Sequence, residues 1–164
     1  SSTYNLALTQ VRGEECIEIS CRGIGSGIVD FAQDLVGGTH TGYHGLEWDG
    51  EHLWASSPPA KAIFKLRLET GDDATAITAC SWFPVAFGNR PHGLAWADDA
   101  KTQIWCNDTT LHAAYRYDAA SGECLEILVL PKDAPDSHGM TIVDGHLWYC
   151  EDQPPGRICE VIPL

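Results

Sequence analysis

The stretch HGLEWDGEHLW, residues 44–54, occurs three times in related form along the chain. It recurs as HGLAWADDAKTQIW at residues 92–105 and as HGMTIVDGHLW at residues 138–148. The His-Gly pairs that open the three copies are 48 and 46 residues apart. Self-similarity at a fixed period is typical of proteins built from repeated supersecondary units.

Each copy is followed by the same pattern of turns and short alternating segments. After the last tryptophan come polar turn residues, and then an alternating run such as Ile63-Phe64-Lys65-Leu66 or Tyr115-Arg116-Tyr117. Two of these runs end in a Gly turn and lead into another extended segment. Short alternating segments separated by turns every ~8–12 residues are typical of antiparallel sheet. The pattern therefore predicts an all-β chain.

Four strands in ~46 residues make one blade of a β-propeller. We predict blades over residues 40–86 and 87–133, and a third blade over residues 134–164 with only three strands of its own. Residues 13–20 resemble the fourth-strand sequence that begins at residue 122. This N-terminal strand is therefore predicted to close the third blade, which makes residues 1–164 a single half-propeller domain.

Three blades are too few for a closed ring, because propellers typically carry ~4–8 blades. Two chains related by a two-fold axis would form one six-bladed ring, so the sequence predicts a homodimer. A weaker alternative is a four-bladed monomer in which residues 1–40 form a degenerate blade. That stretch lacks the repeated His-Gly and Leu-Trp pattern.

The composition excludes several classes of partner. The 164 residues include 10 Lys and Arg against 23 Asp and Glu, a formal net charge of −13. Such a chain repels phosphate backbones and anionic lipid, so neither nucleic acid nor a membrane is expected as a partner. There is no apolar run of the ~18 residues that a membrane span needs, and no secretory signal is visible. The chain has seven cysteines and no CxxC pair, which favours free thiols in a reducing cytoplasm. The alternative, a secreted protein with some disulfides, stays open.

Histidine opens every copy of the repeat, at positions 44, 92 and 138. His44, His92 and His138 would begin the innermost strand of each blade and ring one mouth of the central channel. The Gly after each would let neighbouring backbones crowd near the axis. Converging neutral imidazoles bind Zn, Fe, Cu or Ni, so the three are predicted ligands of a divalent metal ion of unknown identity. The alternative is that each His only hydrogen-bonds a neighbouring blade.

A second set of polar residues varies between the repeats. Ser57, Asp108 and Glu151 stand three residues after the repeated tryptophan. Carboxylates beside histidines act as general bases or metal ligands, so the predicted catalytic residues are His138, Glu151 and Asp108. The alternative is that the two acids are solvated turn residues, which an acidic chain has in plenty.

The sequence also resembles the propellers of the streptogramin (virginiamycin) B lyase group and its NHL-type and YncE-like relatives. The resemblance runs over roughly residues 40–164, and its carriers are PHGLA at 91–95, DGHLW at 144–148, and IFKL at 63–66 before Thr70-Gly71. It implies a propeller that carries a divalent ion. The lyase pattern has a Glu at the place of Glu151 and Asp108, and a His two residues beyond one such Glu. This chain has Gln153 and Thr110 there, so the lyase reaction itself is not implied.

These features predict a divalent-metal-dependent lyase or hydrolase that acts on a small cyclic or ester-like molecule at a His-ringed channel. The histidines would hold the metal or move a proton, and Glu151 and Asp108 would serve as base or ligand. The alternative is a non-catalytic propeller that binds a ligand or a partner protein. A cytoplasmic location completes the expectation.

Overall fold

The computed structural model describes residues 7–12, 15–20, 42–70, 75–86 and 90–162, which form β-strands joined by turns and loops. The strands are β1 (Ala7–Arg12), β2 (Glu15–Ser20), β3 (Leu46–Trp48), β4 (Leu53–Ser57), β5 (Ala62–Thr70), β6 (Thr75–Pro84), β7 (Pro91–Trp96), β8 (Gln103–Asp108), β9 (Ala113–Asp118), β10 (Cys124–Val129), β11 (Ser137–Val143), β12 (His146–Glu151) and β13 (Ile158–Val161). The prediction of an all-β chain is confirmed. Over these residues there is no helix that could cross a membrane.

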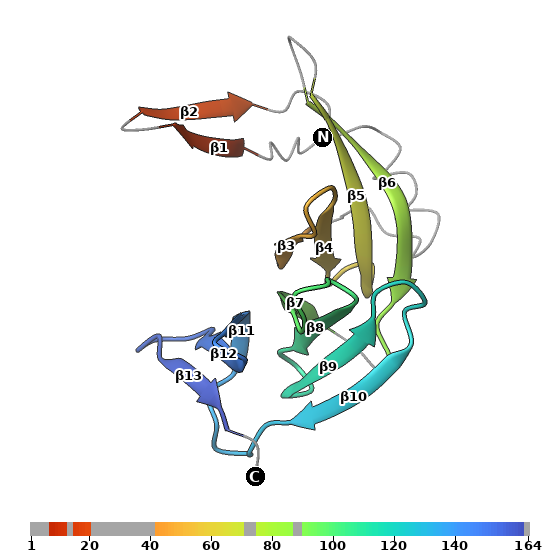
Figure 1. Ribbon diagram of the computed structural model, residues 1–164. Coiled ribbons are helices and arrows are strands. Elements are labelled where there is room, and N and C mark those ends of the chain that lie inside the picture. Colours follow the sequence, from red (N-terminus) through yellow and green to blue (C-terminus); the bar gives the residue numbers. More distant parts are fainter. Residues whose placement is uncertain (1–6, 13–14, 21–41, 71–74, 87–89, 163–164) are drawn as a thin grey trace.

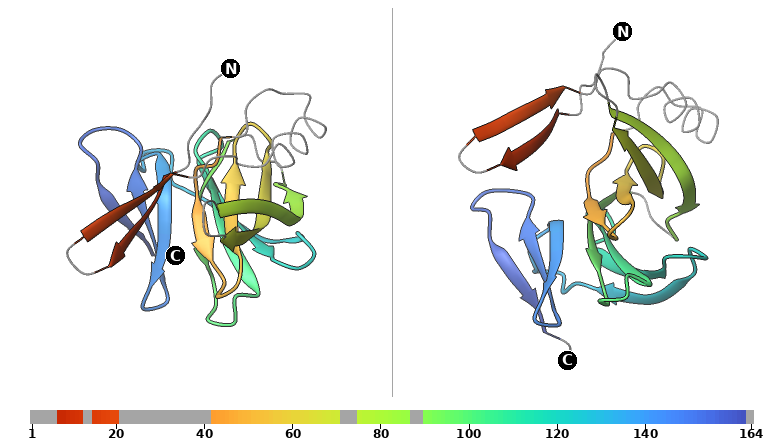
Figure 2. Two further views of the ribbon diagram at one scale, coloured as in Figure 1. Left: turned by 90° about the horizontal axis from the view of Figure 1, so that it is seen from above. Right: turned by 45° about the horizontal axis from the view of Figure 1, so that its top comes forward.

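The strands form four antiparallel sheets, and each sheet consists of strands that are consecutive in the sequence. The first sheet is β3-β4-β5-β6, the middle sheet is β7-β8-β9-β10, and the third sheet is β11-β12-β13. These three sheets lie side by side around one centre, with β3, β7 and β11 nearest to it and β6 and β10 on the outside (Figures 1 and 2). A four-stranded meander with its first strand innermost is the arrangement of a propeller blade.

The strands β1 and β2 form a separate two-stranded sheet, with Ala7 opposite Ser20 and Arg12 opposite Glu15. A strand was predicted over residues 13–20, and the structure has one over residues 15–20; residues 13 and 14 lie outside the described part. Within one copy of the chain β2 pairs with β1 and not with β13. Closure of the last blade by this strand, across a subunit boundary or within its own half, stays a prediction.

Tight hairpins set the register of the third sheet. Asp144 and Gly145 join β11 to β12 with positive φ values of 51° and 80°, the backbone that a two-residue type I′ turn requires. Val143 consequently stands opposite His146, and Thr141 opposite Trp148. This register places Trp148 on one side of the sheet and Leu147 on the other.

Apolar side chains fill the spaces between adjacent sheets. Between the first and middle sheets, Trp54 and Trp96 meet edge to face with ring centroids 5.3 Å apart, and the Trp96 Nε1 donates to the Trp48 carbonyl at 3.0 Å. Between the middle and third sheets, the buried residues Trp105 and Leu147 belong to one cluster. The second-strand tryptophans Trp54 and Trp105 thus pack between adjacent sheets.

Candidate metal centre

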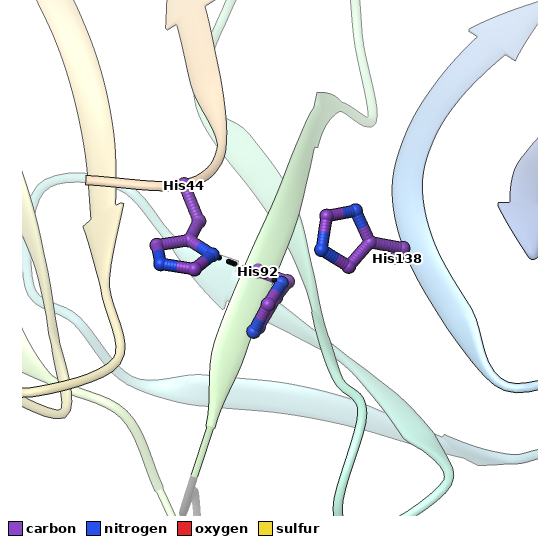
Figure 3. A group of neighbouring side chains, drawn as sticks. All are labelled: His44, His92 and His138. Atoms are coloured by element: carbon purple, nitrogen blue, oxygen red, sulfur yellow. Dashed lines mark hydrogen bonds between the residues drawn. The ribbon is translucent and has the colours of Figure 1, made fainter. Parts of the chain in front are cut away.

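The three repeat histidines converge where the inner ends of the three sheets meet (Figure 3). The Nδ1 atoms of His44 and His92 are 3.2 Å apart. The ring centroid of His92 lies 4.3 Å from that of His44 and 4.4 Å from that of His138. One ring nitrogen from each of the three can be chosen so that all lie within 4.8 Å of one another. The predicted cluster is therefore present.

The repeat itself explains why the histidines come so close. A Cβ on Gly45 would overlap the His92 carbonyl oxygen, and a Cβ on Gly93 would lie 2.6 Å from both the His138 carbonyl oxygen and the Met140 nitrogen. Real side chains do not tolerate such distances to backbone atoms. Glycine after His44 and after His92 thus lets successive inner strands approach, as the sequence predicted.

Side chains of the second strands fix the histidine backbones from the preceding sheet. Ser56 Oγ donates to the His92 carbonyl, and Asn107 Nδ2 donates to the His138 carbonyl at 2.9 Å. Ser56 and Asn107 occupy equivalent positions, two residues after Trp54 and Trp105. The histidine positions therefore depend on contacts between sheets as well as on the strands that carry them.

The environment of the cluster disfavours protonation of two of the rings. Burial, together with the nearby His44, His138 and Arg90, lowers the pKa of His92 to about 4, and Asp152 opposes this shift. Burial, with His138 and Arg90, also lowers the pKa of His44. A neutral imidazole is the form that binds a metal ion. At neutral pH these two rings are therefore available as ligands.

A cavity of about 170 Å³ opens beside the cluster. The histidines, the glycines that follow them and the next residues line it: His44, Gly45, Leu46, His92, Gly93, Leu94, His138, Gly139 and Met140. Among the described residues the buried Nε2 of His92 has no hydrogen-bond partner. His92 is 1% exposed, whereas the side chain of His138 is 40% exposed, so the cluster runs from the interior to the surface.

The structure does not bring Asp108 to this cavity. Its side chain is buried, and Oδ2 accepts from the Arg90 backbone N–H at 2.8 Å. Oδ1 accepts from the backbone N–H groups of Thr110 and Leu111, both at 2.9 Å. Asp108 thus stabilises the turn after its own strand. This agrees with the alternative that Asp108 is a turn residue, except that its side chain is buried and not solvated.

Glu151 is likewise engaged elsewhere. Its carboxylate accepts from Arg157 Nη2 at 2.7 Å and from Arg157 Nε at 2.9 Å, a bidentate pair that also receives the Arg157 backbone N–H. These hydrogen bonds lower the pKa of Glu151 to about 2. The pair joins the ends of β12 and β13, and Glu151 does not line the cavity.

The carboxylate nearest to the histidines is one that the sequence did not single out. Asp152 Oδ1 lies 3.5 Å from His138 Nε2. Asp152 follows Glu151 directly, and its backbone N–H donates to the Asp136 carbonyl at 3.0 Å, which brings the loop before β11 next to the end of β12. The repeat gave no signal for it, because no equivalent carboxylate stands in the other two copies. A further histidine, His40, stands four residues before His44 in the sequence and lies outside the described residues.

No protein-family model matches the chain, and no curated protein sequence matches it either. Among solved structures, a putative 6-phosphogluconolactonase from Bacteroides uniformis is similar with a TM-score of 0.55 at 10% identity, over 90% of this chain and 42% of that one. A second putative 6-phosphogluconolactonase, from Bacteroides fragilis, gives 0.53 at 17% identity over 73% and 37%.

A structure of a different kind is also similar. The Cps50 (Swd1) β-propeller domain of Myceliophteria thermophila has a TM-score of 0.52 at 14% identity, over 74% of this chain and 38% of that one. The chain thus spans well under half the length of each of the three. At these identities the likeness concerns the fold alone, and the fold it shows is that of a β-propeller.

Proposed function

We propose that His44, His92 and His138 hold a divalent metal ion, and that the protein is a metal-dependent lyase or hydrolase acting on a small molecule at this mouth of a propeller channel. The observation that carries the proposal is the convergence of three imidazoles from three separate sheets on one cavity. In this proposal the first, middle and third sheets are three blades, and the protein works in the cytoplasm.

The distances between the rings support a metal site. In a tetrahedral site with Zn–N bonds of ~2.0–2.1 Å, ligand nitrogens lie about 3.3 Å apart. His44 and His92 already have two nitrogens 3.2 Å apart, and one ring nitrogen from each of the three histidines can be chosen so that all lie within 4.8 Å of one another. Three protein ligands leave a fourth position open, which is the arrangement of catalytic zinc sites. The metal would polarise a carbonyl or activate a water molecule there.

Asp152 is the best-placed carboxylate for a role next to this metal. A carboxylate that accepts from a ligand imidazole fixes the orientation of the ring and raises its basicity. With His138 at 3.5 Å, Asp152 is placed to do this. The bonds that engage Asp108 and Glu151 support them as residues that hold the turns around the site. Of the predicted catalytic residues we therefore keep His138 in the reaction itself.

Cyclic esters are the first substrate class to test. Two of the similar structures are described as putative 6-phosphogluconolactonases, and a metal-activated water attacks an ester carbonyl readily. Arg90 is the cation close enough to affect His44 and His92. A substrate with a negative group near its ester could pair with it, despite the net charge of −13.

A non-catalytic propeller that binds a ligand or partner is the second candidate. The specific observation that favours it is that both predicted carboxylates, Asp108 and Glu151, are already hydrogen-bonded within the turns that follow their strands. The His44–His92 contact would then serve only to join adjacent sheets.

The metal content of protein purified without a His-tag tests the proposal. We expect about one Zn, Fe, Cu or Ni per chain, and its loss in a variant with His44, His92 and His138 all changed to Ala. His146→Ala is the matched control, because His146 is exposed and pairs with Glu160 instead. A folded protein that contains no metal and binds none on titration would overturn the metal site.

Hydrolysis of a panel of lactones and linear esters separates the two candidates. An enzyme should show metal-dependent turnover that His138→Ala abolishes and Glu151→Gln changes little. Binding of a metal without turnover of any member of the panel would favour the second candidate.

A further inference from the structure

The interface between the first and middle sheets defines a repeated joint. Its four elements are a tryptophan pair, Trp54 with Trp96; a second-strand side chain, Ser56, that donates to the next His carbonyl; and Gly45 against the next inner strand. The fourth is the Trp96 indole on the Trp48 carbonyl.

The interface between the middle and third sheets repeats the packed tryptophan, the second-strand donor and the close glycine, with Ile142 in the place of the second tryptophan and its indole donor. Trp105 packs in a cluster that contains Leu147, and Ile142 packs against this cluster. In the repeat Ile142 occupies the position of Trp96. Asn107 donates to the His138 carbonyl, and Gly93 lies against Met140. Two joints of the same kind therefore follow one another in one chain.

The side of the third sheet that faces away from the middle sheet carries the first half of such a joint. This half has no partner among the described residues. We call it the front face: Gly139, Val143, Trp148, Cys150 and Ile158. Trp148 is in the place of Trp54, and Cys150 is in the place of Ser56, accepting the Gly139 N–H at 3.3 Å as Ser56 accepts that of Gly45. Val143 and Ile158 are 51% and 76% exposed.

The outer side of β3 carries the other half, which we call the back face: Leu46 and Trp48. Their equivalents in the middle sheet, Leu94 and Trp96, are 2% and 5% exposed because the first sheet covers them. Leu46 and Trp48 are 48% and 47% exposed. One chain thus presents two apolar half-joints that differ from each other and complement each other.

We propose that the front face of one copy binds the back face of a second copy, with Trp148 edge to face against the partner's Trp48. By the pattern of the first joint, the partner's Trp48 indole donates to the Ile142 carbonyl. The Cys150 thiol donates to the carbonyl of the partner's His44, and the partner's β3 lies against Gly139.

A two-fold axis makes this joint twice and closes a ring of six sheets. Six is within the ~4–8 blades of closed propellers, and a third copy would exceed that range. The occupant is a second copy because, among the described residues, the outer side of β3 lacks the cover that β7 and β11 receive, and the front face carries the complementary half-joint. This joint deepens the proposed function, since the partner's three histidines would complete the ring around the same channel.

The mass of the 164-residue chain in solution is the first test. We expect a species of twice 17.9 kDa by native mass spectrometry and by sedimentation. Trp148→Glu and Trp48→Glu should each weaken association by about 30-fold or more, the loss typical of a central interface tryptophan. Val129→Glu is the matched control, because Val129 is 72% exposed on the outer strand β10 and lies on neither face. This substitution should leave the mass of the dimer in solution unchanged.

Mixing the two tryptophan variants gives a sharper test. In a mixed pair one joint carries both substitutions and the other carries neither, so the mixture should recover heterodimer that neither variant forms alone. A symmetric contact between two front faces, or between two back faces, would not be rescued in this way. Circular dichroism and urea unfolding of each variant confirm that loss of association is not loss of folding.

The thiol of Cys150 provides an independent measurement. Its reaction with a maleimide should slow at least about tenfold as the chain associates, and Trp148→Glu should restore the fast rate. A folded chain that stays at 17.9 kDa up to about 100 µM, or a mixture that recovers no heterodimer, would overturn the joint. The histidine cluster lies within one chain, so metal bound by a monomer would leave the proposed function standing while the joint fails.

Discussion

The middle sheet and the third sheet are copies of one repeat in very different surroundings. Every residue of β7 is buried, and so are all but one of β8. In β11 and β12 only Ser137, Leu147 and Tyr149 are buried. The strands have the same register and the same opening His-Gly. What differs is that, in the part of the chain that the structure describes, the middle sheet has a neighbouring sheet on both sides and the third sheet has one on a single side.

The comparison teaches that this repeat gains its burial from its neighbours. In repeat architectures stability is roughly a sum of the stability of each unit and of the interfaces between units. Equivalent positions in the two sheets should therefore respond differently to the same substitution. The predictions below use such pairs and refer to the free energy of unfolding of the monomer, measured with urea at low protein concentration.

The largest difference is expected for the second-strand tryptophans. Trp105→Ala should cost about 3–5 kcal/mol, because it empties a packed space between two sheets. Trp148→Ala should cost about 1 kcal/mol, because that indole is only half-buried. Equal losses of unfolding free energy would contradict the idea that neighbouring sheets stabilise the middle sheet more than the third.

The glycines after the histidines come next. Gly93→Ala puts a methyl group against the backbone of the third sheet, 2.6 Å from two of its atoms, and should destabilise by about 2–3 kcal/mol. Gly139→Ala meets only Cys150 Sγ at 3.1 Å, so its effect should stay below about 1 kcal/mol. A tolerated Gly93→Ala would show that the inner strands are able to separate.

The pH dependence isolates the buried histidine. The pKa of His92 is about 4 in the folded protein, below its ordinary value of ~6.5, so the unfolded chain takes up a proton first. The free energy of unfolding should therefore fall by about 2–3 kcal/mol as the pH drops from ~6.5 to 4. The measurement uses chelator-treated protein, and His92→Gln should flatten the profile in this range. A profile that His92→Gln leaves unchanged would contradict the assignment.

The smallest effect is expected at the side chains that join the sheets. Asn107→Ala removes the donor to the His138 carbonyl and should cost about 1 kcal/mol. Cys150→Ala, at the equivalent position of the third sheet, should be nearly neutral in the monomer. Were Cys150→Ala the more costly of the two, the equivalence of these positions would be wrong.

The sequence predicts the fold of this protein well because the repeat is long and its turns are explicit. Asp-Gly pairs and alternating runs determine where strands begin and end, so the sheets and the histidine cluster follow from spacing. The partners of single carboxylates do not follow. Asp108 takes the N–H groups of its own turn, and Glu151 takes Arg157, since the local turn geometry offers them donors nearer than the cavity.

Exposure is the other property that the repeat could not predict. Trp48 is expected to pack like Trp96, yet 47% of it is exposed, because burial depends on whether a further sheet is present. Asp152 escapes prediction for a related reason: its proximity to His138 arises from contacts between a loop and a strand end that no copy of the repeat shares.

The two unlike faces of the chain have a consequence for solubility. A head-to-tail contact generates a closed ring only when the rotation from one copy to the next divides a full turn, and otherwise it generates an open fibre. A substitution that alters the angle between adjacent sheets, as at Gly93, would leave the front and back faces able to bind each other. The two copies would then no longer form a closed ring in which both faces are buried. The glycines that bring the histidines together would then also decide whether this protein stays in solution or polymerises.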